Sequence, residues 1–173
     1  MLRVRTAADV ERFVESMTYE HRDPYKVRSA WQVIRSKRGH CAEAWLAVSL
    51  LFEQLGVLPW GLYLEFSNTT DGIVRHLTHI RDENGYIGLG KSRTEALGGV
   101  AGPYFYVEDL VAYYRSRKER EGYTFRHWEL VDLTPTRADW RYAPQPFEHV
   151  TDFANPDCQN KFTGHMKVRH RLG

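Results

Sequence analysis

The sequence has few cysteines, no long hydrophobic run and almost no net charge. Two cysteines in 173 residues are too few for the disulfide framework of a small secreted domain, so we expect free thiols in a reducing compartment. No stretch approaches the roughly 18 apolar residues of a membrane span, and the N-terminal segment lacks the apolar centre of a signal peptide. These absences predict a cytoplasmic protein with no membrane partner.

Charge and composition limit the partners and the size of the fold. The chain has 24 Lys and Arg against 22 Asp and Glu, a net charge of +2, which gives no electrostatic argument for binding nucleic acid. A hydrophobic content of 42% is typical of a globular protein, and the length suits one domain. We expect one domain over residues 1–150 and an irregular basic C-terminal tail over residues 151–173.

Capping-box patterns predict two short helices near the N-terminus. Thr6 is followed three residues later by Asp9, and Ser29 by Gln32, each ahead of apolar residues at helical spacing. Residues 41–55 are apolar on nearly every side, which predicts a buried central helix. Helices therefore dominate the first third of the chain.

An antiparallel sheet is expected after the central helix. β-favouring residues predict strands, and Asn84-Gly85 predicts a tight hairpin because both residues tolerate positive φ angles. A later apolar stripe on an otherwise polar segment predicts another helix lying over the sheet. The expected strands are residues 60–66, 74–81, 86–89 and 125–133, and the expected helix is residues 107–118.

Cys41 is the first candidate for chemistry, because it lies at the start of the central helix and follows several basic residues. Free amide N–H groups and the positive end of the helix dipole stabilise a thiolate, so we expect the pKa of Cys41 to fall from about 8.5 towards 7 or below. The alternative is that Cys41 is a small buried core residue.

A thiol nucleophile needs a base, and His76 and His79 lie on a predicted strand. Side chains alternate along a strand, so only one of these histidines faces the helix. The same alternation sends the two rings to opposite faces and argues against a shared metal ion, so we predict no metal site. The alternative for either histidine is a polar residue on a half-exposed strand.

A phosphate-loop pattern, G-x-x-x-x-G-K-S, is matched by the residues from Gly85 to Ser92. A functional phosphate loop needs a strand before the first glycine and a long helix after the serine. Here Gly85 belongs to a predicted hairpin, and Gly98-Gly99 follows too soon for a long helix. Nucleotide binding therefore stays a minor alternative.

Several motifs occur in the order found in one group of thiol enzymes. They resemble the transglutaminase-like, papain-like cysteine enzymes, and within them an uncharacterised bacterial family, over residues 8–150. The motifs are Ser29 with Val33-Ile34-Arg35, then His40-Cys41-Ala42-Glu43-Ala44, then His76-Leu77-Thr78-His79 with Asn84-Gly85, then Leu89-Gly90-Lys91-Ser92-Arg93, and finally Asp139-Trp140-Arg141.

The resemblance implies an α+β fold with a papain-like core, in which the nucleophile helix packs on an antiparallel sheet. Cys41 would attack a carbonyl carbon, and His76 would act as base and then acid, with His79 as the alternative base. No cofactor is implied. The family's third catalytic residue, an Asp or Asn, is replaced here, and the candidates to support the histidine are Glu43, Lys91, Ser92, Asp82 and Asp132.

We therefore interpret the chain as a cysteine-dependent acyl-transfer enzyme. It would hydrolyse an amide or thioester, or move the acyl group to an amine, with a peptide, a protein or a small acyl compound as substrate. Two alternatives stay open. One is an inactive binding domain of the same fold that has lost the third catalytic residue, and the other is a phosphate-loop nucleotide-binding protein.

Overall fold

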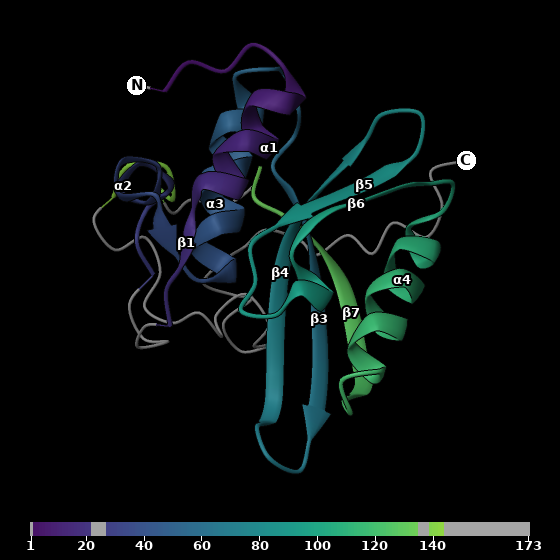
Figure 1. Ribbon diagram of the computed structural model, residues 1–173. Helices are drawn as coiled ribbons and strands as arrows, with labels where there is room; N and C mark the ends of the chain where they lie inside the picture. Colours follow the sequence, from purple (N-terminus) through teal and green to yellow (C-terminus); the bar gives the residue numbers. More distant parts are fainter. Residues whose placement is uncertain (1, 22–26, 135–138, 144–173) are drawn as a thin grey trace.

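A computed structural model describes residues 2–21, 27–134 and 139–143 and shows an α+β protein (Figure 1). The predicted basic tail, with Cys158, lies outside the described residues. The helices are α1 (Ala7–Ser16), α2 (Ala30–Ser36), α3 (Cys41–Glu53), the short 3-10 helix η1 (Glu95–Leu97) and α4 (Val107–Glu119). The strands are β1 (Thr18–Tyr19), β2 (Arg38–Gly39), β3 (Trp60–Asn68), β4 (Gly72–Asp82), β5 (Tyr86–Gly90), β6 (Gly99–Tyr104) and β7 (Thr124–Asp132).

Five strands form an antiparallel sheet in the order β6-β5-β4-β3-β7. The strands β3 to β6 follow one another as neighbours, because each turn folds the chain directly back. The last strand, β7, returns to the opposite edge and pairs with β3 from Trp60↔Asp132 to Ser67↔Thr124. The two-residue strands β1 and β2 pair in parallel and join the segments before and after α2.

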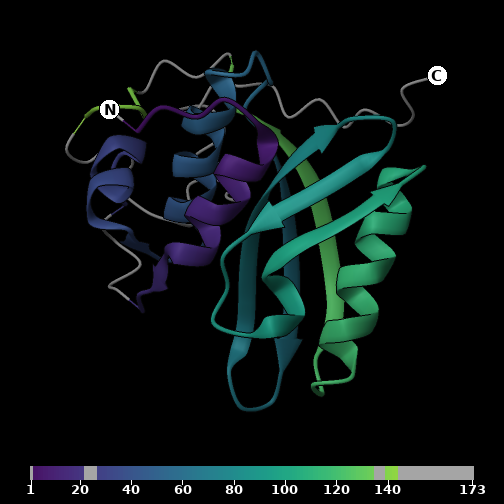
Figure 2. The same ribbon diagram turned by 45° about the horizontal axis from the view of Figure 1, so that its top comes forward.

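Helices cover both faces of the sheet (Figures 1 and 2). On one face α1, α2 and α3 pack with Leu77 of β4 and Leu89 of β5 in one hydrophobic cluster. On the other face α4 and η1 pack with Leu64 of β3 and Ile80 of β4 in a second cluster. We refer to these as the α3 face and the α4 face of the sheet.

The central helix α3 is buried over nearly its whole length. The residues from Ala42 to Phe52 are all buried, as expected for a helix that is apolar on every side. The close approach of α3 to β3 needs a glycine, since a Cβ on Gly61 would lie 2.6 Å from Cε2 of Trp45. The sheet therefore leaves room for the largest side chain of the helix.

The predicted helix starts are confirmed at the atomic level. Oδ2 of Asp9 accepts a hydrogen bond of 2.9 Å from the Thr6 amide, and Oε1 of Gln32 accepts one of 3.1 Å from the Ser29 amide. The expected strands, the hairpin at Asn84 and Gly85 and the second long helix are also present, with ends that differ by one to a few residues.

Strand β6 was not predicted, because its sequence Gly-Val-Ala-Gly-Pro-Tyr contains three residues that normally interrupt strands. It forms at the edge of the sheet, where Pro103 needs no backbone N–H for a further neighbour. The pair β1–β2 was also missed, since two residues carry no periodic pattern. Among the described residues, we find no helix with the length and apolar character needed to cross a membrane.

Candidate active site

Cys41 is the first residue of α3, and its thiol lies against the backbone of β4. Sγ is 3.8 Å from the carbonyl oxygen of Arg75, and the backbone amide of Leu77 also interacts with the sulfur. These two residues flank His76 in the sequence. The fold thus places Cys41 beside the strand segment that the sequence predicted.

The thiol reaches β4 because that part of the strand has an open edge. Strand β5 pairs with β4 only from His79 to Asp82, and no described strand pairs with Arg75 or Leu77 on that side. An open edge presents free carbonyl and amide groups. The thiol of Cys41, at the beginning of α3, interacts with two of these groups, the carbonyl of Arg75 and the amide of Leu77.

The pKa of Cys41 is raised, which corrects the expectation of a lowered pKa. Burial is the largest cause, because removal from water disfavours the thiolate, and the carboxylate of Glu43 adds to it. The backbone amides of Leu77, Ala42 and Cys41 itself act in the opposite direction. The resting state is a neutral thiol surrounded by amide groups that would stabilise an anion.

The ring of His76 lies on the α4 face, while α3 packs on the other face. Its centroid is 6.3 Å from that of Tyr114, and the ring also interacts with the backbone of Leu97. Burial is the main cause that lowers the pKa of His76 to about 3, and nearby Lys118 lowers it further. Nε2 has no hydrogen-bond partner, and no hydrogen bond joins the His76 ring to Cys41 in the described part of the chain.

His79, the alternative base, faces α3 but lies far from Cys41. Nδ1 is 3.3 Å from Oγ of Ser49, and the ring stacks on Phe52 at a centroid distance of 4.7 Å. Ser49 is eight residues after Cys41, about 12 Å along the helix. Burial lowers the pKa of His79 to about 3. The structure therefore places His79 in the core and not beside the thiol.

Glu43 is wholly buried and belongs to an ion-pair network. Arg28 donates three hydrogen bonds of 2.9 to 3.0 Å to its carboxylate, from the backbone amide, Nε and Nη2. Arg28 also bonds to Glu20 at 2.9 Å. These bonds from Arg28 and the charge of His40 hold the pKa of Glu43 below its usual value, against the effect of burial. We assign Glu43 a structural role.

The other predicted supporting residues form hydrogen bonds elsewhere than at the His76 ring. Nζ of Lys91 donates to the carbonyl of Val14 at 3.3 Å, and Oγ of Ser92 accepts from the Thr94 amide at 3.3 Å. Asp82 and Asp132 each accept a bond from the backbone of a neighbouring turn. None of these side chains forms a hydrogen bond to His76 in the described residues.

The phosphate-loop lookalike has a different structure. Gly85 lies in the β4–β5 turn, Gly88 and Gly90 lie in β5, and Ser92 is followed by the three-residue helix η1. Within residues 91–98 there is no long helix to present a row of amides to a phosphate group. The geometry gives the nucleotide-binding alternative no support.

Two contributors to the site were not predicted. Tyr19 of β1 lies close enough to Cys41 and Arg93 for their charges to affect its pKa, which burial raises to about 12. The backbone of Leu97 in η1 interacts with the His76 ring, whereas the sequence motifs pointed only to side chains for that role. Both depend on contacts between distant segments, and a backbone group leaves no signal in the sequence.

The described residues contain no group of three or more His, Cys, Asp or Glu side chains placed to hold a metal ion. The chain matches no family model, and a search of curated proteins finds no match either. The resemblance to transglutaminase-like enzymes therefore rests on the sequence motifs alone.

Proposed function

We propose that this chain is a cysteine-dependent acyl-transfer enzyme of transglutaminase-like type, with Cys41 as nucleophile and His76 as its base. The observation that carries the proposal is the position of the thiol, which lies against the backbone on both sides of His76. A nucleophile at the beginning of a buried helix and a histidine on the adjacent strand are the parts that such chemistry needs.

The proposed reaction begins with a neutral pair. The Sγ proton moves to His76 as sulfur bonds to the substrate carbonyl carbon, and His76 then gives the proton to the leaving amine or thiol. Water or an amine next attacks the thioester and releases Cys41. The amides of Leu77 and Cys41 are suited to hold negative charge during these steps.

The Leu97 backbone supports this proposal because it gives the His76 ring a hydrogen-bond partner. Such a partner fixes one tautomer and leaves the other nitrogen available as a base. Nε2 is the nitrogen without a partner. Productive geometry requires the ring to approach the edge where Cys41 lies, and substrate binding along this edge would accompany that movement.

A second candidate function is a non-catalytic binding domain of the same fold. The observation that favours it is the present direction of the His76 ring, which lies beside Tyr114 on the α4 face. A histidine whose pKa is about 3 is a weak base. In this case Cys41 is a half-buried thiol with no partner for proton transfer.

The pH dependence of Cys41 alkylation by iodoacetamide separates these functions. Mass spectrometry would follow Cys41 and Cys158 together in the wild type, His76→Gln and His79→Gln. The enzyme proposal predicts that His76→Gln slows labelling of Cys41 about tenfold at neutral pH, whereas His79→Gln leaves it unchanged.

Equal labelling rates in the wild type and His76→Gln, with a rise only at alkaline pH, would overturn the enzyme proposal in favour of the binding domain. Thermal unfolding of each variant checks that it is folded. A slower rate in His79→Gln alone would transfer the role of base to His79.

A further inference from the structure

A pocket of about 420 Å³ lies at the other end of β4 from Cys41. It is formed by the turn after β4, the beginning of β5 and the segment that leads into α4. Asp82 in this pocket follows Arg75 by seven residues, which corresponds to about 23 Å along the strand. The pocket is therefore separate from the candidate active site.

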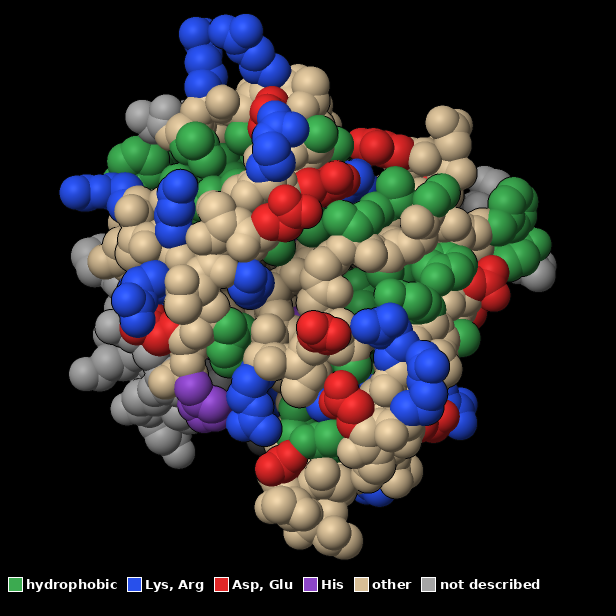
Figure 3. Space-filling model, viewed as in Figure 1, with side chains coloured by type: hydrophobic (Ala, Val, Ile, Leu, Met, Phe, Trp, Pro, Cys, Tyr) green, Lys and Arg blue, Asp and Glu red, His purple; other side chains and the backbone are tan. Residues whose placement is uncertain are grey.

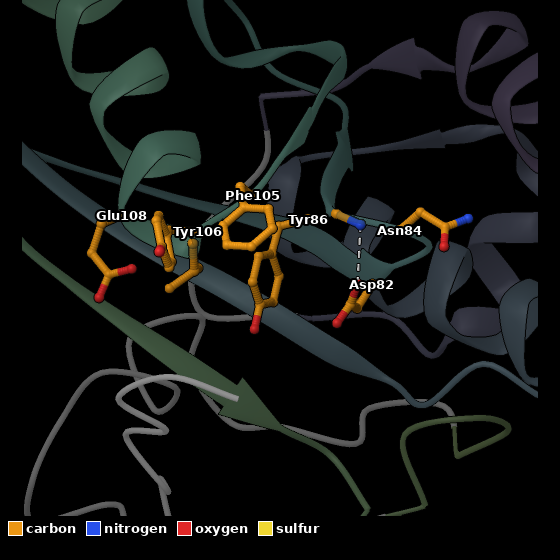
Figure 4. A pocket seen from close by; sticks show the side chains of 8 residues that line it. Asp82, Asn84, Tyr86, Phe105, Tyr106 and Glu108 are labelled. Atoms are coloured by element: carbon orange, nitrogen blue, oxygen red, sulfur yellow. Dashed lines mark hydrogen bonds between the residues drawn. The ribbon is translucent and has the colours of Figure 1, made fainter. Parts of the chain in front are cut away.

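Three aromatic rings line the pocket, from Tyr86, Phe105 and Tyr106 (Figure 4). Phe105 has the largest exposed fraction of any large hydrophobic side chain described, 79%, and its ring meets that of Tyr106 edge to face at 4.8 Å. Hydrophobic side chains also gather over the adjoining surface of β5 and β6 (Figure 3). A contiguous exposed apolar patch with polar residues at its rim is typical of a binding surface.

The backbone around the pocket has a register shift in β5 and a glycine with a positive φ angle. The pairing of β5 with β6 shifts register between Tyr86 and Gly88, and such bulges redirect side chains. A Cβ on Gly85 would lie 3.0 Å from the carbonyl oxygen of Tyr104, and the residue has a φ of +139°. The absence of a side chain at position 85 lets the end of β6 approach the turn after β4, which lines the pocket.

Two carboxylates, from Asp82 and Glu108, flank the rings, and none of the described residues that line the pocket is basic (Figure 4). Asp82 uses Oδ1 to accept the Gly85 amide at 3.2 Å. Glu108 has no hydrogen-bond or ion-pair partner among the described residues. An acidic residue in the first turn of α4 is stabilised by the helix dipole, and Asp109 occupies that turn as well as Glu108. Asp109 does not line the pocket, so the helix dipole alone does not explain why Glu108 lies there.

We infer that this pocket binds an organic ammonium ion. Aromatic faces attract a cation through their quadrupoles, and desolvation strengthens the attraction, which is why aromatic groups with nearby carboxylates select alkylammonium groups over neutral ones. The ligand is either a free quaternary amine or the methylated ammonium group of a lysine side chain. This inference does not depend on the reaction at Cys41.

Titration with choline and with its neutral isostere 3,3-dimethylbutan-1-ol tests the charge requirement. Choline is expected to bind in the millimolar range and to shift the NMR signals of Phe105 and Tyr106, and the neutral compound is expected to bind at least about fivefold more weakly. Peptides that contain lysine or trimethyllysine distinguish the two sources. Tighter binding of the trimethyllysine peptide than of choline identifies a protein side chain, and the reverse order identifies a free amine.

Matched variants assign the effect to the pocket. Phe105→Ala and Glu108→Gln are each expected to weaken choline binding about threefold to tenfold. The controls Val100→Ala, an exposed hydrophobic residue of β6 outside the pocket, and Asp109→Asn are expected to leave it unchanged. Alkylation of Cys41 provides a separate readout and should not change in any of these variants.

Three results would overturn the inference. They are equal binding of choline and its neutral isostere, no binding of choline or either peptide at millimolar concentration, and equal effects of Glu108→Gln and Asp109→Asn. Equal binding of the two compounds would identify an apolar contact surface. Equal effects of the two substitutions would show that choline responds to the overall negative charge at this end of α4 and not to Glu108 in the pocket.

Discussion

The two faces of the sheet hold their helices in different ways. On the α3 face, ion pairs join separate segments, as between Arg28 and Glu43 and between Arg81 and Glu11. On the α4 face, the ion pairs of α4 stay within its own chain segment, as between Lys118 and Glu121. The comparison teaches that ion pairs between segments help to locate the layer that carries Cys41. Helix α4 is located mainly by packing, with hydrogen bonds from Arg117 to the backbone carbonyls of Glu95 and Ala96 in η1.

Substitution of Glu43 by Gln is expected to have the largest effect. It leaves the Arg28 charge, whose side chain is 17% exposed, without its buried partner, so the free energy of unfolding should fall by about 3 kcal/mol. Chemical denaturation measures this change. The control Glu53→Gln removes a partly exposed pair with Arg141 and should cost about 1 kcal/mol or less.

Equal losses in these two variants would show that the buried charge network does not distinguish the α3 face. The acid stability of the wild type gives a second check. The pKa of Glu43 is lowered in the folded state, so its contribution is present above the unfolded pKa and is lost as pH falls through the folded pKa.

Gly88→Ala tests the packing of the α4 face. A Cβ at this position would lie 2.5 Å from the hydroxyl oxygen of Tyr114, so we expect the free energy of unfolding to fall by about 2 kcal/mol. In a Tyr114→Phe background the same substitution should cost about half as much or less. The control Gly98→Ala, whose nearest neighbour would be 3.6 Å away, should change stability little.

A double-mutant cycle measures the coupling of Gly88 and Tyr114. No coupling would mean that the helix moves freely to accept the added methyl group. That result would contradict the conclusion that close packing against the sheet fixes the position of α4.

Most helices and strands could be predicted from the sequence, but the face of the sheet that each helix covers could not. The buried helix beginning at Cys41 and the turn at Asn84-Gly85 were predictable, because periodicity and positive φ preferences act locally. Alternation also predicted correctly that His76 and His79 face opposite sides. Which face receives α3 depends on the packing of distant segments, and no local pattern encodes it.

The electrostatics of the site were harder to predict. Basic neighbours and the helix start suggested a lowered pKa for Cys41, but the burial created by α3 and β4 exceeds these effects and raises it. Likewise Glu43 was a candidate catalytic group until its bonds to Arg28 became visible. Arg28 lies 15 residues earlier, and nothing in the sequence joins the two.

The two buried histidines provide a prediction that compares the faces directly. Each has a folded pKa of about 3, below the unfolded value of 6.5, so the unfolded state binds more protons between these values. Stability should therefore fall with decreasing pH, by about 1.6 kcal/mol per histidine between pH 6.5 and 5. Urea denaturation at several pH values measures the slope.

His79→Leu should remove its share of this slope, and His76→Leu should remove a similar share. A slope that persists in both leucine variants would show that other groups cause it and that folding does not lower the pKa of these histidines.

The smallest effect is expected on the solvent side of α4. Glu119→Gln removes an exposed pair with Arg115, whose atoms are 2.8 Å apart, and should lower the free energy of unfolding by about 0.4 kcal/mol. Added salt should reduce the difference between variant and wild type. A loss of more than about 1 kcal/mol would mean that an exposed ion pair within α4 contributes far more to stability than such pairs normally do, which would weaken the contrast between the faces.

The position of β7 has a consequence for how the chain folds. The hairpins from β3 to β6 join residues close in sequence, but β7 pairs Asp132 with Trp60, more than seventy residues earlier. Closing so large a loop lowers the chain entropy before the contacts of β7 stabilise the fold, so the local hairpins form first and β7 docks late. Until then the edge of β3 stays uncovered, and a nascent chain that stops after α4 would expose a long hydrophobic strand to aggregation.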